Sequence, residues 1–246
     1  VEMRDHAAAF EEVMRLLARN RDLTPDCVGH RLVHGGTFFK GDLFLTPEAM
    51  ADLEKTEALA PIHNPPAFRL IKACQERYPD LPQAIIFDTA FHSTIPAYAR
   101  TYALPKEIRE GMGVRKYGFH GISHQYVTSV AAQFLKIPLD RFNAVSCHLG
   151  SGGASLCAVV NGRSVDNTMG YSPLQGMLMS TRCGDLDPAV ALQMIARADG
   201  DYKSVDKALN SRSGVLGVSG LSADIRDILS RRGGEAAPQI ERAWQV

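Results

Sequence analysis

An Asn-Gly pair at positions 161 and 162 restricts the fold of this chain more than any other local feature. It follows the apolar run Ser155–Val160, and both positions of such a two-residue turn need positive φ, which Asn and Gly adopt readily. The pair therefore predicts an antiparallel hairpin. Because other apolar runs alternate with helical patterns, we expect a mixed-sheet α/β architecture and not a purely parallel sheet.

Three further segments have the short apolar character of buried strands. Val28–Val33 precedes a Gly-Gly pair, Ala84–Phe87 ends at Asp88, and Ala144–Cys147 enters the glycine-rich segment His148–Gly153. In α/β folds, ligands collect at the carboxyl ends of strands. The residues that follow these runs are therefore the first candidates for a functional site.

Helical periodicity and capping signals mark other segments. The expected helices run over residues 3–17, from Thr46, from Asn64, over Pro105–Gly111, over Ser123–Leu135, and from Asp187 to about Ala198. Ser123 is a candidate cap for its helix. We place a domain boundary near residues 88–95, which divides the chain into residues 1–90 and 91–246.

The charge balance and the hydropathy pattern argue against two classes of partner. Lys plus Arg and Asp plus Glu each total 27, so the formal net charge is zero. This balance gives no support to nucleic-acid binding through a broad basic face. The chain has no long apolar run, and no signal peptide is visible at its start. We therefore expect neither a membrane span nor a membrane partner.

The cysteines bear on the cellular compartment. The chain has five, and no two of them form a C-x-x-C pair. This pattern predicts reduced, mostly buried thiols, no zinc site and a cytoplasmic protein. The chain lacks an initiator methionine, opens inside an apparent helix, and stops soon after another helical pattern begins. We therefore expect it to be truncated at both ends.

Two arginines and an aspartate stand in positions suited to anion chemistry. Arg31 lies just before a Gly-Gly turn, where its guanidinium can bind a small anion or can simply face solvent. Asp88 stands among apolar residues, either as a helix cap or ion-pair partner or as a metal or catalytic group. Arg182 lies in a polar turn before an expected helix.

Two glycine-containing segments carry histidines. Gly118 and Gly121 flank Phe119-His120, which predicts a sharply bent loop with a functional or an incidental histidine. His148–Gly153 lies between two expected strands, as an anion-binding nest of backbone N–H groups or as a plain tight turn. It is no P-loop, because no Gly-Lys-Ser/Thr follows, and no dinucleotide fingerprint, because the next element is a strand.

This inventory suits an anionic reaction such as phosphoryl transfer, and no G-x-S-x-G elbow supports acyl transfer by a Ser-His-Asp triad. Its segments also resemble, in order and spacing, the acetate kinase family, which belongs to the sugar kinase/actin-like superfamily. The resemblance spans nearly the whole chain. The blocks that carry it are His30–Gly36, Ala60–Pro65, Phe87–His92, Tyr117–His124, His148–Gly153 and Met169–Pro188.

The resemblance implies roles at the matching positions. Arg31 matches the arginine that binds the substrate carboxylate, and Asp88 matches an active-site aspartate. A carboxylate nucleophile with a pKa of about 4 is already ionised at pH 7. Asp88 is therefore expected to organise Mg²⁺ through its waters, although the family pattern also admits a base. His120 and Arg182 match the pair that stabilises the transferring phosphoryl group.

The resemblance also implies two binding surfaces. Val33, Ile62, Phe119 and Pro173 match the apolar pocket for the acyl methyl. The nucleotide positions are His148, Leu149, Gly150, Ser151, Gly152, Asp224, Ile225 and Arg226. Ser151 stands where the family usually has asparagine, and Ile225 stands where several members have a different side chain.

The implied architecture is a ribonuclease H-like, two-domain fold that is incomplete here. Residues 1–90 belong to the acyl-substrate side, and residues 91–246 belong to the nucleotide side, which also joins a homodimer. The family has an opening strand with a Gly/Ser-rich turn, a Gly-Ile-Gly-Glu-Asn segment and a late metal-linked glutamate. None of the three occurs in this sequence.

The implied reaction is phosphoryl transfer from ATP to acetate, which gives ADP and acetyl phosphate, with Mg²⁺ or Mn²⁺ as cofactor. Val33 and Phe119 suggest a narrow pocket that favours acetate, and propionate kinase is the alternative. A catalytically incomplete nucleotide-binding fragment is the alternative from another class. The expected partners are a short-chain carboxylate, ATP and a second copy of the chain.

Overall fold

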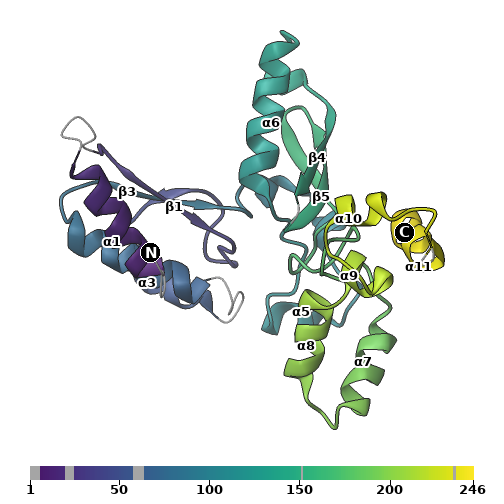
Figure 1. Cartoon of the computed structure of the whole chain (residues 1–246). Coiled ribbons are helices and arrows are strands. Elements are labelled where there is room, and N and C mark those ends of the chain that lie inside the picture. The colour runs from purple at the N-terminus through teal and green to yellow at the C-terminus, as the bar shows by residue number, and fades with distance from the viewer. Residues whose placement is uncertain (1–5, 20–24, 58–63, 151, 235–236) are drawn as a thin grey trace. The chain divides into compact units, whose positions relative to one another are not determined.

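The computed structural model describes residues 6–19, 25–57, 64–150, 152–234 and 237–246. The chain divides into two compact units, Val1–Ser93 and Thr94–Val246 (Figure 1). Each unit has a sheet of its own. The expected α/β fold with a mixed sheet is confirmed, because the first unit pairs strands in both directions.

The first unit is built on a small mixed sheet. Strand β1 (Val28–Leu32) pairs in parallel with β3 (Gln83–Phe87), and the two-residue strand β2 (Leu43–Phe44) pairs antiparallel with β3. The register places Leu32 opposite Phe87. The carboxyl ends of β1 and β3 therefore lie side by side, and the residues that follow them emerge at one edge of the sheet.

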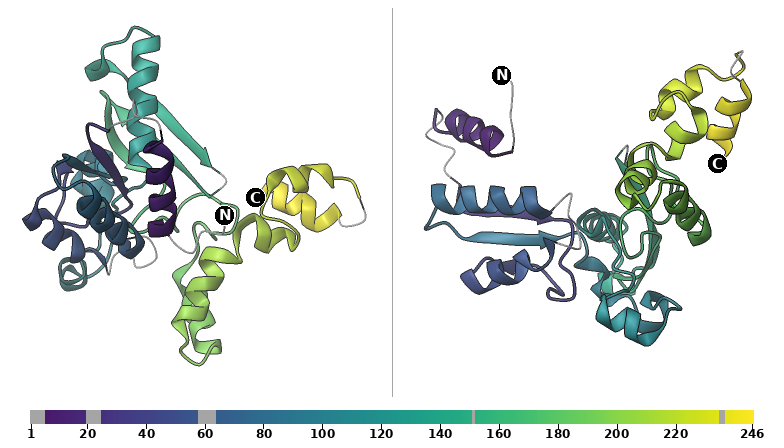
Figure 2. Two further views of the ribbon diagram at one scale, coloured as in Figure 1. Left: turned by 60° about the vertical axis from the view of Figure 1, so that its left-hand side comes forward. Right: turned by 90° about the horizontal axis from the view of Figure 1, so that it is seen from below.

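Three helices accompany this sheet. They are α1 (His6–Leu17), α2 (Pro47–Glu54) and α3 (Asn64–Arg77), and all three were expected from the sequence. The Thr46 hydroxyl caps α2 by accepting the backbone N–H of Ala49 at 3.2 Å. Helix α3 contacts β1 and lies along the sheet (Figure 2). The buried core comprises Leu32, Met50, Leu53, Phe68, Ile71, Ile85 and Phe87.

The second unit contains an antiparallel meander of β4 (Ala144–Gly150), β5 (Gly153–Val160) and β6 (Arg163–Asn167). The turn between β5 and β6 is the Asn-Gly pair, with φ of 52° at Asn161 and 72° at Gly162. The hairpin predicted from this dipeptide is therefore confirmed. A Cβ atom on Gly162 would lie 2.5 Å from the Leu139 carbonyl oxygen, so the turn needs glycine for space as well as for φ.

The glycine-rich segment His148–Gly153 lies mostly within the two strands that it joins. His148, Leu149 and Gly150 belong to β4, Gly153 begins β5, and Gly150 pairs directly with Gly153. The connection is therefore reduced to two residues. One of them, Ser151, lies outside the described residues. Glycine tolerates the extended backbone here because the cross-strand ladder supplies the hydrogen bonds.

The second unit also contains the helices α4 (Ala97–Arg100), α5 (Lys106–Gly111), α6 (Gly121–Phe134), α7 (Pro188–Arg197), α8 (Tyr202–Ser211), α9 (Gly214–Ser219), α10 (Ile225–Ser230) and α11 (Ala237–Gln245). Of these, α5, α6 and α7 were expected, and α11 lies where a further helical pattern was expected to begin near the end of the chain. Two helices of this unit contact its sheet, α6 at β4 and α4 at β6, and other helices lie beyond it (Figure 1). Helices α9, α10 and α11 share a separate small core.

Two sequence-based expectations need correction. Ser123 does not cap α6: the helix begins at Gly121, and His120 occupies the capping position with φ of 60°. The thiols are not mostly buried, since Cys27 and Cys147 are exposed whereas Cys74 and Cys157 are buried. Alternation along β4 turns Cys147 outward, because Ser146 faces the interior. Among the described residues, no helix is long and apolar enough to cross a membrane.

Candidate active site

The first unit presents an arginine–aspartate pair at the carboxyl edge of its sheet. Arg31 Nε donates to Asp88 Oδ1 at 3.0 Å, and Nη2 donates to Oδ2 at 2.5 Å. The Asp88 side chain is 3% exposed, whereas that of Arg31 is 61% exposed. The bond to Asp88 raises the pKa of Arg31. Of the interpretations open for Asp88, the ion pair is therefore present, and it fixes the plane of the guanidinium.

A buried polar network supports the turn after β1. His34 Nδ1 accepts the Gly36 N–H at 2.8 Å, and the Asn64 amide donates to the His34 carbonyl at 3.3 Å and to Thr56 Oγ1 at 2.9 Å. These contacts hold the segment that carries Val33. Sequence reasoning missed the network, because its members come from segments that only the tertiary structure brings together.

The second unit directs His120 and Arg182 at one point. A Cβ atom placed on Gly153 would lie 3.2 Å from Arg182 Nη1 and 3.2 Å from His120 Cε1. Arg182 Nη1 also donates to the Pro173 carbonyl at 3.2 Å. Burial lowers the pKa of Arg182. The absence of a side chain on Gly153 thus keeps open the space that both groups face.

Three histidines cluster around this point. His148 stacks on His120 with ring centroids 4.1 Å apart, and its Nδ1 lies 3.0 Å from Ser123 Oγ. His124 follows one turn of α6 later and is fully buried. The sequence signal for this cluster was available: histidines four apart lie on one helix face, and Ser146 and His148 lie on one strand face.

A cavity of about 640 Å³ lies next to the end of β4. Leu149 and Gly150 line it together with the start of α10, where Asp224, Ile225 and Arg226 lie. The structure thus brings together two of the predicted nucleotide segments. Arg226 donates to the Asp224 carboxylate and lowers its pKa to about 2. Trp244 of α11 also lines the cavity and was not anticipated.

A model of the acetokinase family matches residues 1–246 of this chain. The chain belongs to the acetokinase family.

Curated relatives and solved structures agree with this assignment. An acetate kinase of Clostridium botulinum (strain Langeland / NCTC 10281 / Type F) is 47% identical over 232 residues, covering 92% of this chain and 58% of that protein. An acetate kinase of Clostridium novyi (strain NT) is 45% identical over 235 residues, covering 93% of this chain and 58% of that protein. The chain therefore spans about three fifths of the length of these relatives.

Two solved structures show the same architecture. The acetate kinase from Entamoeba histolytica has a TM-score of 0.90 at 40% identity, covering 98% of this chain and 62% of that one. A propionate kinase from Francisella tularensis subsp. tularensis SCHU S4 has a TM-score of 0.89 at 36% identity, covering 97% of this chain and 62% of that one. This acetokinase-family chain has the actin-like fold that the resemblance implied.

The other expected site residues are distributed as follows. Val33 is half-buried directly after β1, and Phe119 is 1% exposed directly before His120. Pro173 offers its carbonyl to Arg182. His148 stands in the histidine cluster, and Gly152 is an exposed turn residue. Ile62 and Ser151 lie outside the described residues.

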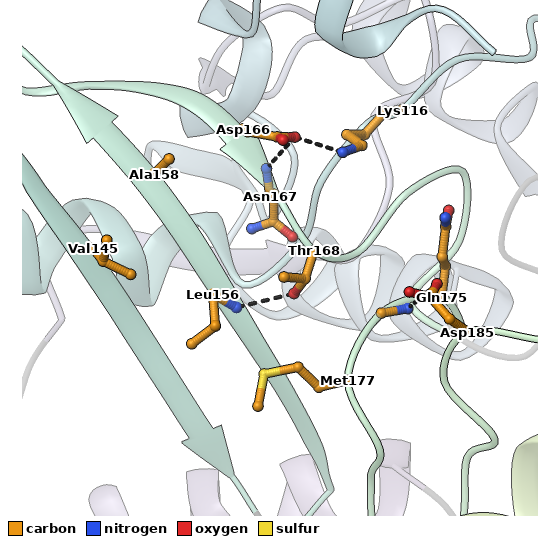
Figure 3. Close-up of a pocket in the computed structure, with 11 residues that line it drawn as sticks. Lys116, Val145, Leu156, Ala158, Asp166, Asn167, Thr168, Gln175, Met177 and Asp185 are labelled. Atoms are coloured by element: carbon orange, nitrogen blue, oxygen red, sulfur yellow. Dashed lines mark hydrogen bonds and ion pairs between the residues drawn. The ribbon is translucent and has the colours of Figure 1, made fainter. Parts of the chain in front are cut away.

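A second cavity, of about 500 Å³, contains none of the expected site residues (Figure 3). Leu156 and Ala158 of β5 line it, and Lys116 forms an ion pair with Asp166 at 2.5 Å at its edge. Because side chains alternate along a strand, Leu156 points away from the face on which Ser155 meets the histidines. This cavity is therefore separate from the histidine cluster.

Proposed function

We propose that this acetokinase-family protein transfers a phosphoryl group reversibly from ATP to acetate, with ADP and acetyl phosphate as products. One observation carries the proposal: His120 and Arg182 converge on the space above Gly153. A phosphoryl group carries negative charge on its equatorial oxygens, and hydrogen-bond donors aimed at those oxygens stabilise the transition state. The family membership of the chain points to the same reaction.

The acetate side of the reaction needs charge compensation and no proton abstraction. A carboxylate with a pKa of about 4 is ionised at pH 7, so the nucleophile is already formed. The proposed carboxylate ligand is Arg31, whose guanidinium has five N–H donors. Two of these donors engage Asp88. Asp88 would then act by holding the guanidinium plane, which leaves another edge of it to face the substrate.

The nucleotide is proposed to occupy the cavity beside Leu149 and Gly150, with its base near the start of α10. The lining residues Trp244 and Ile225 give it an apolar wall. We propose that residues 91–246 carry the nucleotide side and residues 1–90 the acyl side.

ATP-dependent phosphoryl transfer also needs Mg²⁺ or Mn²⁺, which neutralises phosphate charge. The described residues do not by themselves form a site for this ion. Both oxygens of Asp88 engage Arg31, and no three His, Cys, Asp or Glu side chains gather as ligands in the described ranges. We therefore propose that the ion arrives bound to the phosphates of ATP.

Arg182→Ala is the variant that tests the phosphoryl clamp. It should lower kcat by roughly 10²–10³-fold and change the acetate KM much less, because the lost interaction acts mainly in the transition state. The assay traps acetyl phosphate with hydroxylamine, and Arg163→Ala, an exposed arginine on β6, is the matched control. A change confined to KM would move Arg182 to a binding role.

Propionate is the second candidate substrate, and the similarity to a propionate kinase structure favours keeping it. One methylene changes binding in an apolar pocket by about 1–3 kcal/mol. We expect kcat/KM for acetate to exceed those for propionate and butyrate in the native-length protein. A higher value for propionate would reverse the choice. Nucleotide binding by the 246-residue chain without acyl phosphate formation would instead support the incomplete-fragment hypothesis.

We also propose a cytoplasmic homodimer, joined through residues 91–246, with no nucleic-acid or membrane partner. The balanced charge of 27 basic and 27 acidic residues supports the absence of a nucleic-acid partner. Light scattering on the native-length protein should give twice the mass of one chain. A monomer at all concentrations would contradict the dimer.

A further inference from the structure

A buried chain of hydrogen bonds leads from His120 into the interior of the second unit. Ser155 Oγ lies 2.9 Å from His120 Nδ1 and 2.9 Å from His124 Nε2. His124 Nδ1 in turn lies 2.9 Å from Ser146 Oγ. Ser155 and His124 are fully buried, and Ser146 is 5% exposed. Two imidazoles are thus joined through one hydroxyl that is shielded from water.

The number of hydrogens in this chain restricts its states. A serine hydroxyl has one hydrogen, so Ser155 can donate to only one of the two ring nitrogens that it meets. If both hydrogen bonds are made, the other nitrogen must carry a hydrogen and donate it to Ser155. His120 Nδ1 and His124 Nε2 therefore cannot both be bare: where His120 Nδ1 carries no hydrogen, His124 Nε2 must carry one.

His124 itself is neutral at physiological pH. Burial, with a smaller contribution from His148, lowers the pKa of His124 to about 4. A neutral imidazole carries a hydrogen on one nitrogen only. A hydrogen on His124 Nε2 therefore leaves Nδ1 bare, and Nδ1 then accepts the Ser146 hydroxyl. The tautomer of His124 and the state of His120 are linked.

The surroundings of His120 favour one of the two arrangements. The Nε2 side of its ring faces the space above Gly153, which the Arg182 guanidinium also faces. His148 stacks on the ring, and the Arg182 cation disfavours a second positive charge nearby. A neutral His120 can donate a hydrogen from Nε2 only if Nδ1 is bare, and this requires Ser155 to donate to Nδ1.

We propose that His124 is a positioning residue that acts through Ser155 to keep His120 in its Nε2–H form, ready to donate toward a phosphoryl oxygen. In this arrangement His124 carries its hydrogen on Nε2 and donates to Ser155, and Ser146 donates to His124 Nδ1. The inference rests on the proposed function, because it takes His120 as the donor to the transferring group.

Nitrogen-15 NMR of the histidine rings tests the linkage directly in the unmodified 246-residue chain. We expect both His120 and His124 to carry hydrogen on Nε2 and none on Nδ1 at pH 7.5. A neutral His124 with hydrogen on Nδ1, beside a His120 that is bare at Nδ1, would overturn the inference. This measurement needs no substitution, so a variant that fails to fold does not weaken the test.

Two variants of His124 that are isosteric with each other then distinguish the two directions of the hydrogen bond to Ser155. His124→Gln keeps a donor toward Ser155, so His120 should stay in its Nε2–H form. His124→Glu offers acceptors, so Ser155 should donate to the glutamate and the hydrogen should appear on His120 Nδ1. In the native-length protein, His124→Glu should lower kcat roughly ten- to a hundredfold below His124→Gln, with less change in KM.

The two His124 variants are then compared in a Ser155→Ala background, with a Ser164→Ala background as the matched control. Both serines are fully buried, in β5 and β6 of one sheet. In the Ser155→Ala background, the Gln and Glu variants should have the same His120 tautomer, whereas in the Ser164→Ala background the difference should persist. A difference that survives Ser155→Ala would overturn the role of Ser155.

His120→Ala separates this inference from the proposed function. Unchanged phosphoryl transfer in that variant would reject His120 as the donor, while a linkage seen by NMR would still stand. If His120→Ala loses phosphoryl transfer but His124→Gln and His124→Glu have the same His120 tautomer, the linkage is rejected and the proposed function remains intact.

Discussion

At the scale of single residues, burial decides the chemistry of the imidazole rings. His124 is fully buried, and its pKa is lowered to about 4 from an ordinary value of 6.5. The unfolded chain therefore binds a proton at this ring at a higher pH than the folded chain does. Titration of this ring leaves the free energy of unfolding unchanged above pH 6.5 and lowers it as the pH falls from 6.5 toward 4.

His124→Gln removes this titration and should flatten the pH dependence of stability. We expect the free energy of unfolding of the unmodified chain to fall more between pH 7.5 and pH 5 than that of the variant, because at position 124 only the unmodified chain takes up a proton on unfolding. Urea denaturation at both pH values measures the difference. Equal losses in the two proteins would contradict the neutral, buried state of His124.

In the Arg31–Asp88 pair, the aspartate is the buried partner, so the free-energy cost of removing charge from water falls mainly on Asp88. Asp88 is 3% exposed and Arg31 is 61% exposed, so removal of the arginine leaves a buried carboxylate without its cation. Arg31→Met should lower the free energy of unfolding by about 1–3 kcal/mol. Adding Asp88→Asn to that variant should recover part of the loss, because the remaining amide is neutral.

Asp88→Asn alone completes the double-mutant cycle for this pair. The cycle isolates the interaction between the two side chains from the separate effect of each substitution. Strictly additive free energies of unfolding would show that the pair contributes nothing to stability. They would also remove the argument that Asp88 holds the guanidinium plane.

At the scale of elements, the β5–β6 turn tolerates a side chain at Gly162 poorly. Gly162 has φ of 72°, and a Cβ atom there would meet the Leu139 carbonyl oxygen at 2.5 Å. A side chain at this position would both strain the backbone and displace the segment before β4. The turn therefore ties the hairpin to its neighbour as well as closing it.

Gly162→Ala should lower the free energy of unfolding on the order of 3 kcal/mol. Gly200→Ala is the matched control, because Gly200 also has positive φ, at 86°, but a Cβ atom there would meet no neighbouring atom within 4 Å. We expect the control to cost about 1 kcal/mol, from backbone strain alone. Equal midpoints for Gly162→Ala and Gly200→Ala in thermal or urea unfolding would show that Leu139 moves aside at no cost in free energy.

At the scale of the whole molecule, two compact units each have a core of their own. The core of the first unit includes Ile71, which is 1% exposed, and a separate core in the second unit joins Val215, Ile228, Ile240 and Ala243. No residue belongs to both of these cores. Trp244, the single tryptophan of the sequence, lies in α11 of the second unit.

Ile71→Ala should therefore destabilise the first unit selectively. Loss of a buried isoleucine side chain costs about 2–5 kcal/mol. We expect the variant to shift the early part of the circular-dichroism transition to lower urea, while the transition seen by Trp244 fluorescence stays at its midpoint. An equal shift in both signals would show that the two units unfold as one cooperative body.

Some elements were not expected from the sequence because they are too short to show a period and because no proline marks their start, as Pro105 marks that of α5. Strand β2 has two residues, and α9 and α10 have six each. A hydrophobic period needs a window of about eleven residues or more. The glycine-rich segment was left open, as an anion-binding nest or a plain tight turn, for another reason: glycine is compatible with both, and the sequence does not show that Gly150 pairs with Gly153.

The family, the β5–β6 hairpin and the candidate residues Arg31, Asp88, His120 and Arg182 could be predicted from the sequence, because they depend on local conformational preference and on order along the chain. The tertiary structure alone decided what those residues meet. Ser155 joins His120 to His124 only because α6 packs on the β4–β5 sheet, and Asp88 meets Arg31 only because β1 and β3 pair in parallel. Contacts between distant segments depend on how whole elements pack, and local sequence carries no direct record of that packing.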